Sequence, residues 1–171
     1  IIDELFGHLE GLMAKDIVWK VQLDTYHREL ERYGDNTMEL SESLFCADSW
    51  ATVRFLDLIE GDEGEQLRWL FGLRATEVLL SCFQYSLDEK LGLMEQLKIG
   101  FGREFNMSRP LKKQLDDKYR KEREGIEQFM QFTAEEEPDY IPILDILSET
   151  HHKITPIAKK ILEVERKGAL L

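Results

Sequence analysis

The sequence of 171 residues has no long apolar run, and no stretch of it approaches the ~20 apolar residues that a membrane-spanning helix needs. It also lacks a basic N-terminal region followed by an apolar one, so nothing in it indicates a signal peptide. Cysteine is scarce, and neither Cys46 nor Cys82 lies in a C-x-x-C pair or a His/Cys cluster. We therefore predict buried structural thiols in a cytoplasmic protein, with a disulfide or a nucleophile as less favoured alternatives.

Basic residues are the minority among the charges, with 22 Lys and Arg against 34 Asp and Glu and a net charge of −12. They are also interleaved with acids, as in Lys112 and Lys113 followed by Asp116 and Asp117. A protein that binds nucleic acid through phosphates needs clustered Lys and Arg. This chain is therefore a poor candidate for binding tRNA or DNA by itself.

Apolar residues make up 43% of the chain and charged residues 33%, a composition typical of one globular domain. The chain begins at Ile1 inside an apparent helix and stops after residues 169–171. We expect both ends to be cuts in a longer polypeptide. No group of residues suggests a metal or an organic cofactor site.

The first 24 residues predict a helix and then a strand. Residues 3–15 place apolar side chains at helical spacing, whereas Ile17, Trp19, Val21 and Leu23 alternate with polar or exposed positions. Such alternation, rich in β-branched and aromatic residues, is typical of a strand with one buried face. The expected fold class is α+β and predominantly helical, with this strand followed by five or six helices as part of a larger α+β domain.

Helical spacing continues after Gly34. The expected helices cover about residues 40–59, 67–79, 87–101, 109–129 and 141–167. Ser86 and Ser108 stand where N-caps belong, and Pro110 suits the first turn that follows. Pro156 should kink or divide the last helix.

The segment from Tyr26 to Gly34 is the most unusual in the chain. It holds two arginines, two carboxylates, two tyrosines and a histidine directly after the expected strand, where functional side chains are commonly displayed. Gly34 can adopt the positive φ that a turn into the next helix requires. A cluster of surface ion pairs without a catalytic role is the alternative interpretation.

Two motifs connect this segment with a known family. The pattern Tyr-x-x-Glu-x-x-Arg-Tyr-Gly ends at Gly34, and Glu-x-x-Phe-x-x-Asp-Ser follows from Glu42 to Ser49. Together they resemble the thiopeptide-type bacteriocin biosynthesis domain, which forms the C-terminal part of class I lantibiotic dehydratases and also occurs as stand-alone relatives. Residues 58–62 and 68–74 resemble versions of the same domain, so that the likeness covers most of residues 1–130.

The resemblance implies that residues 1–171 are a partial elimination domain. In the family, a separate N-terminal domain esterifies Ser or Thr of a leader-bearing precursor peptide with glutamate from glutamyl-tRNA. The C-terminal domain then eliminates glutamate, leaving dehydroalanine or dehydrobutyrine. The motif assigns Arg32 to the leaving glutamate or the developing enolate, with Glu29 orienting it. We expect four neighbours to bind substrate, namely Tyr26, His27, Arg28 and Tyr33.

Some of the family's elements have no match in this sequence. The family places further arginines upstream and a histidine in a Ser-x-x-His-Met-x-x-Asn-Arg helix, but after Ser148 and His151 the Met and Asn-Arg do not follow. We therefore expect this piece alone to be inactive and His151 to be a solvated histidine. Two alternatives stay open, a stand-alone relative that forms a pyridine ring by cycloaddition and a non-catalytic peptide-binding helical module. A homodimer is a further possibility.

Overall fold

The computed structural model describes residues 2–168, apart from the side chains of residues 62 and 63, and all regular elements in that range are helical. Ile1 and residues 169–171, where we expected cuts, lie outside the described residues. The elements are α1 (Ile2–Met13), α2 (Leu30–Tyr33), α3 (Met38–Leu56), α4 (Gly61–Cys82), α5 (Leu87–Glu104), α6 (Arg109–Gln131), the 3₁₀ turn η1 (Pro138–Tyr140) and α7 (Ile141–Arg166).

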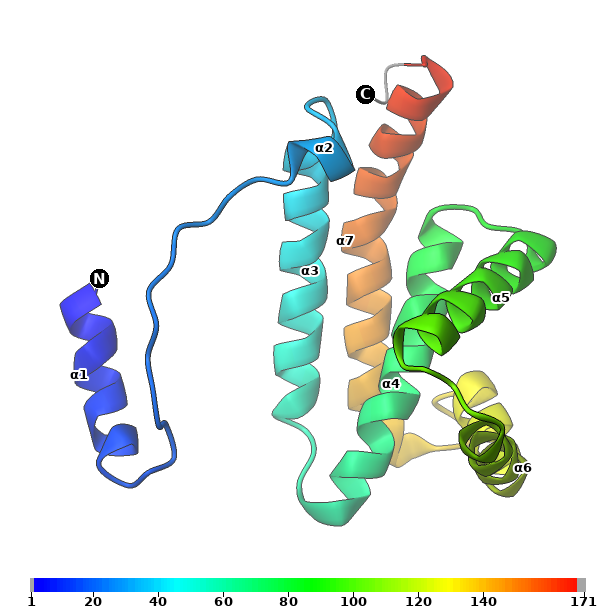
Figure 1. Cartoon of the computed structure of the whole chain (residues 1–171), viewed down its shortest axis with the longest axis horizontal. Coiled ribbons are helices and arrows are strands. Elements are labelled where there is room, and N and C mark those ends of the chain that lie inside the picture. Colours follow the sequence, from blue (N-terminus) through cyan, green and yellow to red (C-terminus); the bar gives the residue numbers. More distant parts are fainter. Residues whose placement is uncertain (1, 169–171) are drawn as a thin grey trace.

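Helices α3, α4 and α7 pack together as the centre of the molecule, with α5 and α6 beside α4 (Figure 1). The rings of Phe55 on α3 and Phe71 on α4 stack with centroids 4.0 Å apart and nearly parallel planes. Around this pair lie the buried residues Ala51, Phe129, Phe132, Ile143, Ile146 and Leu147. The main core is thus built from the apolar stripes of four helices, as their periodicity requires.

A second, smaller apolar cluster joins the end of α4 to the middle of α7. Its buried members are Cys82, Ile154 and Ala158. The Cys82 thiol is therefore buried, as predicted, but Cys46 is exposed, so the prediction for Cys46 was wrong. Helical spacing alone did not show on which side of α3 the Cys46 side chain would lie.

The predicted helix starts at Ser86 and Ser108 are confirmed. Ser86 forms a complete capping box with Glu89, and the Ser108 hydroxyl accepts a hydrogen bond from the amide of Leu111. Proline also stands in the first turn of α6, where its missing N–H is not needed. Pro156 does not divide α7, which continues to Arg166.

The predicted strand at residues 17–24 is absent from the structure, and the α+β fold class was wrong: the described part of the chain is all helical. Residues 19–29 form an irregular connection, with Trp19 86% exposed and Leu23 58% exposed. A strand needs a neighbouring backbone for its N–H and C=O groups. No described segment pairs with these residues, so the alternation of side chains does not produce a buried face.

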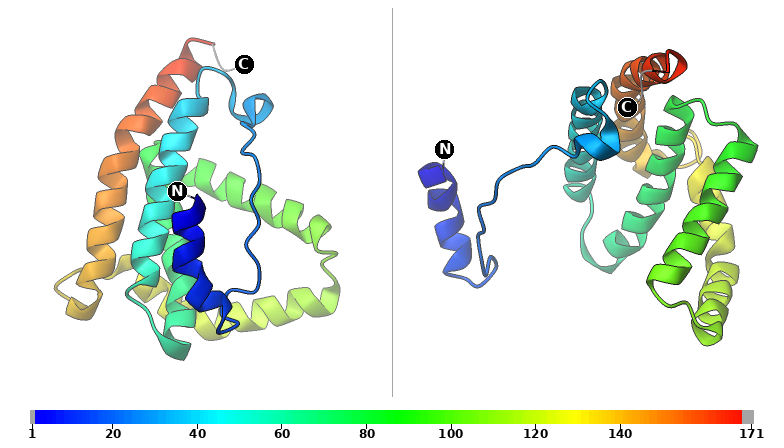
Figure 2. Two further views of the ribbon diagram at one scale, coloured as in Figure 1. Left: turned by 90° about the vertical axis from the view of Figure 1, so that its left-hand side faces the viewer. Right: turned by 45° about the horizontal axis from the view of Figure 1, so that its top comes forward.

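Helix α1 stands apart from the bundle at the end of this connection, as Figures 1 and 2 show. None of its residues is buried, and Leu5, Phe6, Leu12 and Met13 are exposed on it. The helix itself confirms the prediction for residues 3–15. Within residues 2–168, none of the helices combines the length and the apolar character needed to cross a membrane.

Candidate functional site

The segment from Tyr26 to Gly34 enters the bundle through a single helical turn. The amides of Arg32 and Tyr33 both donate to the carbonyl of Glu29 at 3.0 Å, and the Gly34 amide donates to the carbonyl of Leu30 at 2.7 Å. Gly34 then turns the chain into α3 with φ 73° and ψ 148°, a conformation essentially restricted to glycine. The positive φ predicted for this glycine is confirmed.

Thr37 fixes the other side of this turn. Its hydroxyl donates to the carbonyl of Tyr33, and the residue is buried at the start of α3. Met38, the first residue of the helix, is buried beside it. The turn that carries Arg32 and Tyr33 is therefore tied to a buried helix end.

Glu42 on α3 brings two of the predicted substrate-binding residues together. Arg28 donates to its carboxylate through two nitrogens, Nε to Oε1 at 2.8 Å and Nη2 to Oε2 at 2.5 Å. The Tyr26 hydroxyl donates to Oε1 of the same carboxylate at 3.0 Å. The hydrogen bonds from Arg28, and to a lesser extent the one from Tyr26, lower the pKa of Glu42. The carboxylate is therefore ionised at neutral pH.

Tyr33 and Phe45 form the second contact between the two motifs. Their rings meet edge to face with centroids 5.2 Å apart, a favourable geometry for aromatic pairs. Thus the residues of Tyr-x-x-Glu-x-x-Arg-Tyr-Gly contact those of Glu-x-x-Phe-x-x-Asp-Ser at two places, through Glu42 and through Phe45. The spacing of the motifs in the sequence has a physical basis in these contacts.

Arg32, the proposed catalytic arginine, is held much more loosely than Arg28. Its side chain is 72% exposed, and its Nη1 lies 3.4 Å from Oε2 of Glu29. The guanidinium also lies 5.5 Å from the centre of the Tyr33 ring. The expected pairing of Arg32 with Glu29 is therefore present, but it is long and exposed to solvent. His27, one of the residues predicted to bind substrate, is exposed at the surface.

A cavity of ≈ 550 Å³ lies between α3 and α4, next to this segment. Phe45, which packs against Tyr33, is one of its lining residues, and Asp48 from the same motif is another. Apolar side chains of α3 and α4 form most of its wall, with Arg68 at the α4 side. Arg32 is not among the lining residues, so the cavity meets the motif through Phe45 and Asp48.

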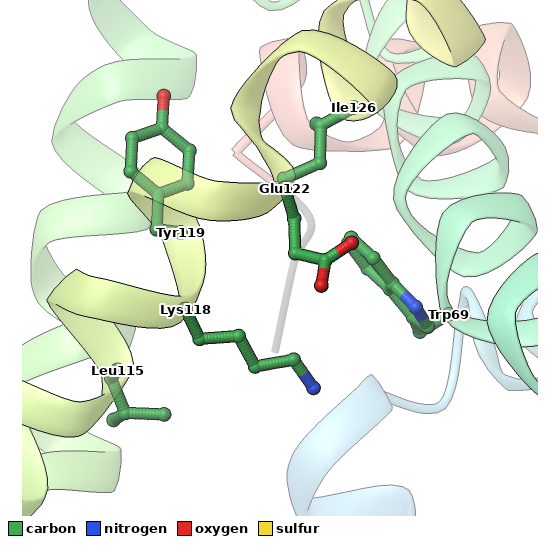
Figure 3. Close-up of a pocket in the computed structure, with 6 residues that line it drawn as sticks. All are labelled: Trp69, Leu115, Lys118, Tyr119, Glu122 and Ile126. Carbon is green, nitrogen blue, oxygen red and sulfur yellow. The ribbon is translucent and has the colours of Figure 1, made fainter.

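A smaller cavity of ≈ 180 Å³ lies between α4 and α6 (Figure 3). Figure 3 shows Lys118 and Glu122 of α6 extending toward Trp69 of α4. No residue of the segment from Tyr26 to Gly34 lines it.

The stretch at residues 68–74, which resembles the family, has structural roles that the sequence did not reveal. Phe71 lies in the core, and Arg74 donates to the carbonyls of Phe129 and Phe132 at 2.8 and 3.0 Å. These carbonyls lie at the C-terminal end of α6, where helix carbonyls lack partners within the helix. Arg74 is therefore a cap for α6.

The histidines of α7 are surface residues. His151 and His152 are both exposed, and the ring nitrogen Nδ1 of His152 lies 2.7 Å from the carbonyl of Ser148. This placement agrees with the expected solvated histidine at position 151.

Comparison with known proteins gives a family for the whole chain. Residues 1–170 match the family model described as "Lantibiotic biosynthesis dehydratase C-term". A stretch of 97 residues is 27% identical to the subtilin biosynthesis protein SpaB of Bacillus subtilis. That stretch is 56% of this chain but 9% of the relative, and no solved structure matches the chain. The family match extends over nearly all of the sequence, and the chain belongs to the lantibiotic biosynthesis dehydratase C-terminal family.

Proposed function

We propose that this chain forms part of a lyase site that eliminates glutamate from glutamylated Ser or Thr in a precursor peptide. The observation that carries the proposal is the exposure of the Arg32 guanidinium, which among the described residues forms one ion pair, 3.4 Å long, with Glu29. Such a cation can accept a substrate carboxylate without first giving up a strong internal partner. Membership of a lantibiotic dehydratase family supports dehydration as the reaction class.

The reaction proceeds by loss of a proton and of a carboxylate. A base removes the α-proton of the glutamylated residue, and the electron pair forms the Cα–Cβ double bond as the Cβ–O bond breaks. Glutamate leaves as a carboxylate, so the step needs stabilised negative charge rather than a strong acid. In our proposal the planar guanidinium of Arg32 binds that charge and Glu29 orients it. The base is not assigned to a residue of this chain.

The partners follow from the proposed reaction. The precursor peptide with its leader is the substrate, and a separate N-terminal domain would supply the glutamyl ester from glutamyl-tRNA. The net charge of −12 on this chain fits a protein in which the separate N-terminal domain, and not this chain, binds the tRNA. Dependence on glutamyl-tRNA requires a compartment that contains tRNA, so the cytoplasm remains the expected location.

The family description supports elimination over the alternative of pyridine-ring formation by cycloaddition, because it names a dehydratase. The similar protein of Bacillus subtilis is a subtilin biosynthesis protein. A peptide-binding module without catalysis is the other alternative, and it predicts that substitutions at Arg32 leave dehydration unchanged.

The test is the Arg32→Ala substitution in the full-length protein, supplied with precursor peptide and glutamyl-tRNA. We expect glutamylated peptide to accumulate, with elimination slowed roughly 100-fold or more, because charge stabilisation in the transition state is lost. Arg32→Lys should restore little, since an ammonium cannot bind a carboxylate through two parallel hydrogen bonds. Mass spectrometry of the peptide distinguishes the glutamylated, dehydrated and unmodified forms.

Arg120→Ala is the matched control. Arg120 pairs with Asp117 at the same i,i+3 spacing on α6, and its side chain is 69% exposed, close to the value for Arg32. This variant should dehydrate the peptide at the rate of the unsubstituted protein. Full dehydration by Arg32→Ala would contradict the proposed function.

A further inference from the structure

The carboxylate of Glu42 is the anchor for the irregular segment that precedes α2. Three hydrogen bonds run to it from this segment, two from Arg28 and one from Tyr26. Their donors lie 14 and 16 residues away in the sequence and on the surface of the molecule. Glu42 itself projects from α3, the helix whose other face carries Phe55 into the core.

This arrangement separates the two arginines of the motif. Two nitrogens of the Arg28 guanidinium are bound to Glu42 in the bidentate geometry that arginine forms with carboxylates. Arg32, four residues later, has the long contact with Glu29 and the Tyr33 ring 5.5 Å from its guanidinium, but no close carboxylate among the described residues. The charge of Arg28 is already neutralised by the close carboxylate of Glu42, whereas the charge of Arg32 is only weakly balanced by the distant carboxylate of Glu29.

We propose that Glu42 is a positioning residue, which holds Arg28 and Tyr26 on α3 and thereby fixes the turn from which Arg32 meets the substrate. The inference rests on the proposed function of Arg32. It gives Arg28 and Tyr26 the task of anchoring the segment in place of binding substrate.

The physical requirement is accuracy of placement. A displacement of ~1 Å in a group that stabilises a transition state can lower a rate on the order of 100-fold. Residues 19–29 have no regular structure, and exposed side chains dominate them. Without the bonds to Glu42, the contact of Tyr33 with Phe45 and the bond from Thr37 would hold only the C-terminal end of the segment.

The role is local, because Glu42 is not part of either buried cluster. Loss of its carboxylate should therefore free residues 24–34 while leaving the packing of α3, α4 and α7 intact. This difference separates positioning from a general contribution to stability.

The experiment uses the full-length protein and a precursor peptide that already carries glutamyl esters, so that only elimination is measured. We expect Glu42→Gln to lower kcat about 10- to 100-fold with a smaller change in KM. Amide hydrogen exchange should accelerate in residues 24–34 and stay unchanged in α7. The double variant Arg28→Glu/Glu42→Arg exchanges the two charges. It should be at least 10-fold more active than either single variant.

Glu149→Gln is the matched control, because Glu149 also joins two elements through an arginine, Arg54, far from the motif segment. It should leave elimination unchanged. Full activity of Glu42→Gln, or faster exchange throughout the bundle, would overturn the positioning role even if Arg32→Ala accumulates glutamylated peptide. Full dehydration by Arg32→Ala would instead remove the proposed function, and the positioning inference with it.

Discussion

The guanidinium of Arg74 lies 4.2 Å from the centre of the Phe132 ring while it donates to the carbonyl of the same residue at 3.0 Å. Arg74 on α4 thus contacts the end of α6 in two ways, by cation–π attraction and by hydrogen bonds to free carbonyls. The negative end of the helix dipole lies at these carbonyls, so a partly buried cation such as Arg74 is favoured there. The contact joins two helices whose sequences give no sign of it.

Replacing Arg74 should therefore destabilise the protein without touching the proposed site. We expect Arg74→Met to lower the free energy of unfolding by about 2–4 kcal/mol, because charge-assisted hydrogen bonds and a cation–π contact are lost together. Arg74→Lys should recover only part of the loss, since an ammonium cannot bond both carbonyls in the fork geometry. Denaturant unfolding measures the change, and Arg103→Met, at an exposed position of α5, is the control.

Any side chain at position 34 should lower the stability of the protein. The φ of 73° and ψ of 148° at Gly34 are strained for any other residue, so Gly34→Ala should cost about 1–3 kcal/mol of stability. Gly100→Ala is the control, because Gly100 lies within α5 and an added Cβ would meet nothing within 4 Å. That variant should be stabilised by up to about 1 kcal/mol. Equal effects of the two substitutions in thermal unfolding would contradict the prediction.

The ion pairs of Glu149 predict a dependence of stability on acid pH. Hydrogen bonds from Lys153, at 2.7 Å, and from Arg54 lower the pKa of Glu149 from 4.5 to about 2. A carboxylate with a lowered pKa stabilises the folded state above the unfolded value, and this contribution is lost as pH falls from about 4.5 toward 2. Glu149→Gln should flatten the loss of stability in this window.

The measurement is the midpoint of thermal unfolding for both proteins between pH 2 and pH 6. Because the pair is exposed to solvent, the difference should be modest and should shrink as salt is added. Parallel curves for the two proteins over the whole range would show that these bonds contribute nothing.

The two thiols should differ in reactivity. Cys46 is exposed on α3, whereas Cys82 is 3% exposed and its sulfur accepts a hydrogen bond from the Thr155 hydroxyl at 3.5 Å. A thiol reagent should modify Cys46 rapidly under native conditions and Cys82 only on unfolding. Mass spectrometry of the labelled protein with and without denaturant checks this, and rapid labelling of Cys46→Ala would contradict the burial of Cys82.

Much of the helical structure could be predicted from local sequence. Ser86 with Glu89 and Ser108 with its following proline begin α5 and α6 where the sequence indicated, because a cap and its helix are only three residues apart. Local sequence could not decide whether residues 17–24 form a strand. Alternation defines the face that a strand would bury, but a strand also needs a partner from elsewhere in the chain, and residues 2–168 provide none.

The candidate site was predicted in part. The motif located the segment from Tyr26 to Gly34 and the pairing of Arg32 with Glu29, whose spacing of three residues fits one helical turn. It did not show that Glu42 binds Arg28 and Tyr26, or that Phe45 packs on Tyr33. These contacts span 12 to 16 residues across a turn, and only the path of the chain through Gly34 brings them together.

The sequence by itself determined the approximate positions of the long helices, the N-caps Ser86 and Ser108 and the family motifs, because each depends on residues within a few positions of one another. Only the tertiary structure decided which helices share a core, which thiol is buried and which arginine is bound. Arg28 and Arg32 have the same side chain and lie four residues apart, yet the carboxylate of Glu42 reaches one and leaves the other open to solvent. That difference comes from the direction in which α3 leaves the turn.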